Sequence, residues 1–172
     1  VSRGLGDVYK RQDVLLYSDT IEGNIAYGDS SIDLEEVEKF AKYSAASDFI
    51  SKMPEGYDTV VGERGVGLSG GQKQRISLAR ALAVRPSILI LDDTTSAVDM
   101  ETEKQIQEAL RHLDFSCTKV IIAQRISTTM MADKILVMQH GRITEMGNHE
   151  ELMAKKGYYY ELVQLQTGED LV

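Results

Sequence analysis

The amino-acid sequence predicts an α/β fold in which helices pack against a parallel sheet. From Pro86 onward, short apolar strand patterns alternate with helical patterns, which is typical of parallel β-strands joined by helices. The residues before Pro86 show helical periodicity interrupted by a glycine-rich stretch. With 172 residues, 42% hydrophobic and 27% charged, the chain is long enough to form one globular domain with a core.

Two helical segments are expected before the sheet. Asp33 stands three residues before Glu36, which is the spacing of a capping box, so a helix should begin near Leu34. Its apolar stripe continues at helical spacing until Pro54 stops it. After the glycine-rich stretch, good helix formers with apolar residues at helical spacing predict a second helix over residues 72–84.

The remaining elements follow from periodicity and turn residues. The expected strands are residues 88–91, 119–123 and 134–138, and the expected helices are residues 101–113 and 126–131. The pair His140-Gly141 predicts a hairpin turn into a strand over residues 142–145. Asn148 and Glu151 have capping-box spacing and should start a final helical region that runs to about residue 166.

Composition excludes several classes of protein. The formal net charge is −8 and no basic tract occurs, which argues against a nucleic-acid partner. The longest apolar stretches, residues 87–91 and 120–123, are far shorter than a membrane span. The single Cys117 cannot form an internal disulfide, which fits a reducing compartment.

Two short segments have residue types suited to phosphate and metal chemistry. Residues 68–72 (LSGGQ) end in a helix start, where glycines allow a phosphate to approach the backbone and unpaired N–H groups favour an anion. Taken alone, they favour a serine N-cap with a glycine turn, and only the surrounding segments favour the anion site. Downstream, an apolar strand ends in Asp92-Asp93, a position where a carboxylate can hold Mg²⁺ through water. The alternative is two solvated aspartates at a strand end.

In their order and spacing, these segments resemble the nucleotide-binding domain of ABC transporters. LSGGQKQR looks like the family signature, ILILDD like the Walker B strand and SAVD like the D-loop. The resemblance covers residues 13–166 and implies a RecA-like parallel sheet with flanking helices and an inserted ABC helical subdomain. The helical subdomain would span about residues 30–84 and the α/β core about residues 85–166. Residues 1–12 are interpreted as a non-native or adapter-derived prefix, and residues 167–172 as a tail.

Three further segments resemble the exporter type of this family: residues 20–27 (TIEGNIAY), 56–65 (GYDTVVGERG) and 141–152 (GRITEMGNHEEL). The resemblance implies an ATPase that uses ATP and Mg²⁺ and couples hydrolysis to export at the cytoplasmic face of a bacterial cell membrane. Its implied partners are a second nucleotide-binding subunit, in a head-to-tail dimer, and transmembrane domains. These domains are either fused upstream in the same chain, as is usual in exporter-like chains, or encoded on a partner. No G-x-x-x-x-G-K-[ST] loop occurs, so the isolated chain is expected to be inactive and to bind ATP weakly.

The resemblance also assigns roles to single residues. Asp99 would bridge the dimer, although a helix N-cap before Glu101 is compatible with the same residue. Gln12 falls at the position of the family's Q-loop glutamine but belongs to the prefix. The implied nucleotide contacts are Ser69, Gly70, Gly71, Gln72, Gln12 and Asp99; the implied metal residue is Asp92; the implied catalytic residues are Asp93 and Gln124.

Two residues depart from the family pattern. Asp93 stands where the family has a glutamate that polarises water, and Gln124 stands where it has a switch histidine. Asp is one methylene shorter, and a glutamine amide cannot carry charge or shuttle a proton. Together they resemble the degenerate-site subunit of a heterodimeric exporter, with slow turnover at its own site and a signature that completes the partner's site. The alternative is a regulatory module that never hydrolyses ATP and only stabilises the closed dimer. A chromosome-maintenance ATPase is disfavoured because no sustained heptads or basic patch occur.

Overall fold

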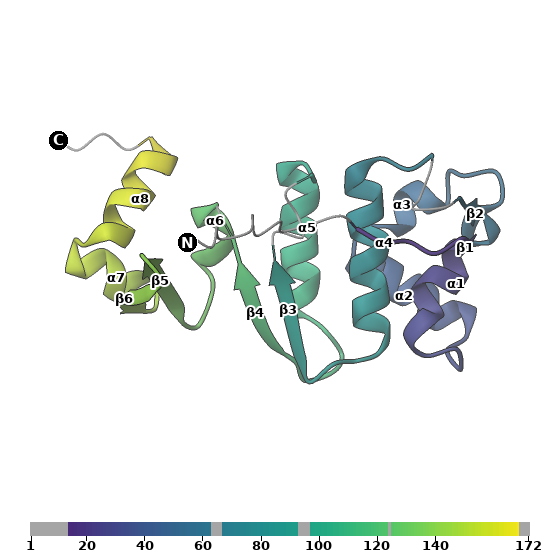
Figure 1. The fold of residues 1–172 in the computed structure, drawn as a ribbon, viewed down its shortest axis with the longest axis horizontal. Helices are drawn as coiled ribbons and strands as arrows, with labels where there is room; N and C mark the ends of the chain where they lie inside the picture. Colours follow the sequence, from purple (N-terminus) through teal and green to yellow (C-terminus); the bar gives the residue numbers. More distant parts are fainter. Residues whose placement is uncertain (1–13, 63–66, 93–96, 124, 169–172) are drawn as a thin grey trace, which may run out of the picture. The chain divides into compact units, whose positions relative to one another are not determined.

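The computed structural model describes residues 14–62, 67–92, 97–123 and 125–168 (Figure 1). The chain divides into two compact units. The first comprises the residues up to 89 and those from 94 to 118; the second comprises residues 90–93 and those from 119 onward.

The first unit is mainly helical. Its elements are β1 (Asp19–Thr20), α1 (Ile21–Ile25), η1 (Ala26–Gly28), α2 (Leu34–Tyr43), α3 (Ser47–Ile50), η2 (Gly56–Asp58), β2 (Val60–Val61), α4 (Gly70–Ala83) and α5 (Met100–Arg111). The short strands β1 and β2 pair antiparallel. Helix α4 begins at the glycine pair, where the sequence predicts that the loop passes into a helix.

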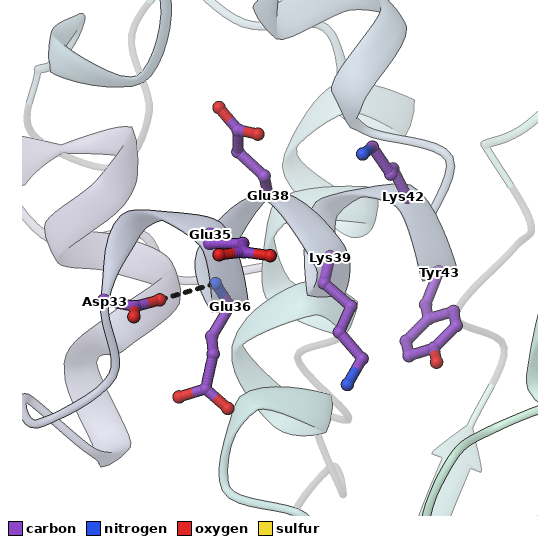
Figure 2. A pocket seen from close by; sticks show the side chains of 7 residues that line it. All are labelled: Asp33, Glu35, Glu36, Glu38, Lys39, Lys42 and Tyr43. Atoms are coloured by element: carbon purple, nitrogen blue, oxygen red, sulfur yellow. Dashed lines mark hydrogen bonds between the residues drawn. The ribbon is translucent and has the colours of Figure 1, made fainter.

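Helix α2 begins as its sequence predicts. The Asp33 carboxylate accepts a hydrogen bond from the backbone N–H of Glu36 at 2.9 Å (Figure 2). Phe40 and Ala41 lie on the buried face of the helix and are fully covered. The apolar stripe does not form one helix, however, because Ala45 adopts a left-handed backbone with φ of 55° and separates α2 from α3.

The strands β3 (Ile88–Asp92) and β4 (Thr118–Ile122) form a two-stranded sheet, and both arrows point the same way in Figure 1. Alternate residues of β3 face opposite sides of the sheet. Leu89 and Leu91 are buried, whereas Ile88 and Ile90 are 63% and 64% exposed. In this structure, β3 therefore buries only one of its two apolar faces.

The second unit continues with α6 (Ile126–Thr129), β5 (Ile135–Gln139), β6 (Arg142–Gly147), α7 (His149–Lys155) and α8 (Tyr158–Thr167). Strands β5 and β6 form the predicted hairpin. His140 and Gly141 both have positive φ, 50° and 74°, as a tight turn of the primed type requires. The register shifts between Val137 and Met138, which marks a β-bulge.

The final helical region is two helices. As predicted, Asn148 and Glu151 form a capping box at the start of α7. Lys156 then adopts a left-handed backbone with φ of 51°, and α8 begins after Gly157. After this break, Tyr159 and Val163 of α8 are buried in the core. The buried residues of that core are Ile126, Ile135, Val137, Leu152, Tyr159 and Val163.

Candidate functional site at the start of α4

The first turn of α4 is held by a reciprocal pair of hydrogen bonds. The Ser69 hydroxyl accepts from the backbone N–H of Gln72 at 3.2 Å, and the Gln72 side-chain oxygen accepts from the backbone N–H of Ser69 at 2.9 Å. This is a complete capping box. The serine N-cap that the sequence allowed as an alternative is therefore present, and it fixes where the helix begins.

The two glycines of this turn lie against the segment that precedes α5. A Cβ atom placed on Gly71 would lie 2.7 Å from the backbone oxygen of Ala97, closer than a real Cβ approaches. A Cβ on Gly70 would lie 3.5 Å from the Ala97 Cβ, which is ordinary contact. One turn further, the Gln74 side-chain oxygen accepts a hydrogen bond from the Ala97 N–H at 3.2 Å. The segment around Ala97 is thus docked on the first two turns of α4, and Gly71 is the position that permits it.

Asp99 caps helix α5. Its carboxylate accepts from the backbone N–H of Thr102 at 2.9 Å and from the Thr102 hydroxyl at 2.8 Å. These two bonds, the backbone one first, hold the pKa of the Asp99 carboxyl below its ordinary value. The cap expected from the sequence is confirmed, while the role of Asp99 as a bridge in a dimer stays a prediction.

Arg75 ties the same helix to the turn between α2 and α3, a role that the sequence did not reveal. Its guanidinium donates to the Ala45 carbonyl at 2.8 Å and to the Gly71 carbonyl at 3.3 Å, and it stacks 4.7 Å from the centre of the Phe49 ring. Burial lowers the pKa of Arg75, but the group stays charged at neutral pH. Its main partner is a backbone carbonyl thirty residues away in sequence, for which no side-chain pattern exists.

The start of α4 is chemically suited to an anion. The first N–H groups of an α-helix have no partner within the helix, and the helix dipole makes this end positive. The Ser69 hydroxyl satisfies the N–H of Gln72, and those of Gly70 and Gly71 belong to the same turn. The donor set therefore fits a phosphate group.

The candidate metal residue is described, but the candidate catalytic residues are not. Asp92 is half-buried at the carboxyl end of β3. Asp93, Gln124 and Gln12 lie outside the described residues. Within the described part of the chain, no group of three or more His, Cys, Asp or Glu side chains could hold a metal ion. A carboxylate is a ligand type that Mg²⁺ accepts, and the role of Asp92 in holding Mg²⁺ stays a prediction.

A pocket on the surface of α2 is separate from these motifs (Figure 2). It is lined by Asp33, Glu35, Glu36, Glu38, Lys39, Lys42 and Tyr43. Charges of both signs share this surface, and Lys39 pairs with Asp114 beyond the end of α5. The pocket contains no predicted site residue. Separately, none of the helices in the described ranges has the length and apolarity to cross a bilayer.

Comparisons with known proteins identify the family and relatives of the chain. A family described as "ABC transporter" matches residues 3–96, a range that begins inside the predicted prefix. The chain is 54% identical over 155 residues to YknU, an ABC transporter ATP-binding protein of Bacillus subtilis (strain 168), covering 90% of this chain and 26% of that protein. It is 50% identical over 161 residues to an ATP-dependent lipid A-core flippase of Syntrophus aciditrophicus, covering 94% of this chain and 27% of that protein.

A putative multidrug export ATP-binding/permease protein of Staphylococcus aureus (strain NCTC 8325 / PS 47) is 53% identical over 157 residues, covering 91% of this chain and 27% of that protein. A bacterial Atm1-family ABC exporter with ATP bound has a similar structure, with a TM-score of 0.84, 44% identity, and coverage of 94% of this chain and 28% of that one. The predicted RecA-like α/β fold is confirmed by this likeness. The chain spans about a quarter of the length of the relatives it matches.

The contact between Gly71 and Ala97 can be tested by two neighbouring substitutions. Gly71→Ala should displace the segment that begins at Ala97, because the added methyl would meet a backbone oxygen. Amide hydrogen exchange over residues 97–102 should then become faster. Gly70→Ala is the matched control, since its methyl would meet only another methyl at ordinary distance. Equal exchange in the two variants would contradict the contact.

Proposed function

The chain belongs to the ABC transporter family, and we propose that it is the ATP-binding part of an exporter that couples ATP binding and hydrolysis to transport across a membrane. The observation that carries the proposal is the start of α4, where the capped turn Ser69–Gln72 and the segment from Ala97 to Asp99 form one docked structure. In this family both segments contribute to nucleotide sites. The relatives named above are called a lipid A-core flippase and a multidrug exporter, so a different cargo accompanies similar ATP-binding sequences.

The proposed complex is a head-to-tail dimer of two nucleotide-binding subunits, each joined to transmembrane domains, at the cytoplasmic face of a bacterial cell membrane. In such a dimer, the signature turn of one subunit completes the ATP site of the other. Ser69, Gly70 and Gly71 would present the start of α4 to the terminal phosphate held by the partner. The helix dipole and the backbone N–H groups of this turn favour that negative charge.

We propose that the chain's own site turns ATP over slowly. Asp92 would hold Mg²⁺, which supplies charge neutralisation at the phosphates. Asp93 has one methylene fewer than the glutamate usual at this position, and general-base chemistry depends on the reach of the carboxylate. Gln124 can donate a hydrogen bond but cannot carry the charge of a histidine. Since both changes fall on one hydrolytic pair while the signature is intact, the partner is proposed to be a different subunit with a competent site.

A regulatory module that never hydrolyses ATP is the second candidate, and the identities of Asp93 and Gln124 favour it. The two candidates differ in whether the remaining architecture of the site can still support chemistry. Restoring glutamate at position 93 and histidine at position 124 distinguishes the two candidate functions.

The decisive variant is the double substitution Asp93→Glu and Gln124→His in the full-length complex. The partner's catalytic residue is disabled, so that only this chain's site reports. ATP hydrolysis should rise by about 10- to 100-fold, because the carboxylate regains its reach to water. Equally slow turnover before and after restoration would favour the non-hydrolysing module. Fast turnover before restoration would contradict the degenerate site itself.

Ser69→Asp separates the structural role of the signature turn from its proposed role in the partner's site. Aspartate is as good an N-cap as serine, so α4 should remain folded, as circular dichroism would show. Its carboxylate would repel the terminal phosphate, and ATP hydrolysis at the partner's site should fall at least about 100-fold, as judged from like-charge repulsion in a desolvated site. Ser69→Asn keeps the cap without the charge and is the control. Undiminished hydrolysis in Ser69→Asp would show that this turn does not face nucleotide.

A further inference from the structure

The turn between α2 and α3 adopts a backbone that is costly for its residue type. Helix α2 ends in a Schellman motif, in which the N–H of Ala46 donates to the Ala41 carbonyl at 2.7 Å. The N–H of Ala45 donates to the Lys42 carbonyl at 3.0 Å. The left-handed position of this motif is usually glycine, but here it is Ala45, with φ of 55°. Because a Cβ atom disfavours this conformation, contacts around the turn have to hold it.

Arg75 contacts this turn and connects it to the start of α4. Its Nη1 donates to the Ala45 carbonyl at 2.8 Å, and its Nε donates to the Gly71 carbonyl at 3.3 Å. The guanidinium lies 4.7 Å from the centre of the Phe49 ring. A guanidinium is planar and its N–H groups have fixed directions. A single rigid group therefore sets the distance between the α2–α3 turn and the first turn of α4.

Charged groups from two other helices act on Arg75. Burial lowers the pKa of Arg75, whereas the carboxylates of Asp99 and Asp48 favour its charged form. The guanidinium stays protonated at neutral pH. Asp48 lies in α3, and Asp99 is the N-cap residue of α5. Arg75 therefore interacts with groups from α3, from the first turn of α4 and from the start of α5.

We propose that Arg75 is a positioning residue for the signature turn, Ser69 to Gln72, where this turn completes the partner's ATP site. The carbonyl of Gly71 and the N–H of Gln72 belong to one planar peptide group. The bond from Arg75 to this carbonyl therefore restrains the direction of an N–H at the helix start, which the Ser69 hydroxyl also binds. A displacement of about 1 Å near reacting groups can lower a rate by about 100-fold. The inference rests on the proposed function, because it takes the signature turn to face the terminal phosphate.

The first test measures this connection without relying on catalysis. Arg75→Lys keeps the charge but lacks the planar group that binds two carbonyls and stacks on a ring. In the full-length complex, amide exchange over residues 46–51 and 72–75 should become about fivefold faster, the effect expected from one lost hydrogen bond. Arg80→Lys is the matched control, since Arg80 lies on the same helix, donates to the Leu15 carbonyl at 2.8 Å and lies 5.1 Å from the centre of the Tyr17 ring. It should leave exchange in both segments unchanged. Unchanged exchange in Arg75→Lys would overturn the inference.

The second test asks whether Arg75 acts on the nucleotide through the signature turn. Because the chain's own site is proposed to be slow, ATP hydrolysis by the full-length complex reports mainly the partner's site. Arg75→Lys should raise the KM for ATP about five- to tenfold and leave the inhibition constant of ADP unchanged, since ADP lacks the terminal phosphate. Arg80→Lys should change neither constant. A fall in kcat alone, as loss of folded protein would produce, or equal changes in both constants, would indicate a purely structural role and overturn the proposal.

Ser69→Asp, made in the same complex, distinguishes failure of this inference from failure of the proposed function. If Ser69→Asp hydrolyses ATP normally, the signature turn does not face nucleotide, and the proposed function and this inference both fail. If Ser69→Asp loses hydrolysis while Arg75→Lys keeps a normal KM for ATP, the proposed function stands and the positioning role of Arg75 is wrong. If Ser69→Asp loses hydrolysis and Arg75→Lys raises the KM for ATP alone, both stand.

Discussion

The close approach of Gly71 to the backbone oxygen of Ala97 is the constraint on which the candidate site depends. Only 2.7 Å would separate a Cβ at Gly71 from that oxygen, so residue type at one position decides whether two distant segments can meet. The Gln74 side-chain oxygen then accepts a hydrogen bond from the Ala97 N–H, and Asp99, two residues after Ala97, caps α5. Because α4 and α5 begin on either side of this contact, the starts of both helices share one fixed geometry.

Capping is the means by which this chain places its polar segments. Ser69 and Asp99 cap the helices that they precede, so the groups proposed to face nucleotide are already oriented by bonds within the chain. Preorganised donors lose little free energy to reorganisation when an anion arrives. In the second unit, Glu145 and Gln166 act over longer sequence distances and tie α8 to β6 and α6. Caps from adjacent residues in the first unit and from distant residues in the second unit therefore both fix where a helix begins.

Features that depend on neighbouring residues could be predicted from the sequence, whereas hydrogen bonds between distant residues could not. The capping box at Asn148 and the hairpin turn at His140 depend on neighbours within a few residues, and both were predicted. The helix break at Ala45 was missed because neither glycine nor proline marks it, and tertiary packing imposes its left-handed backbone. The bonds from Arg75 and Gln166 to distant backbone atoms leave no periodic pattern. The resemblance predicted the RecA-like fold correctly, while the roles of Asp93 and Gln124 remain predictions.

A structure of the full-length complex determined by electron cryomicroscopy during ATP turnover would test the central claim most directly, namely that this chain completes its partner's site while its own site hydrolyses slowly. The account predicts intact ATP beside Asp92, and a nucleotide in the partner's site that is contacted by the first turn of α4 at Ser69 to Gln72. Density for ADP beside Asp92 together with ATP in the partner's site, or a signature turn remote from nucleotide in the closed dimer, would contradict it.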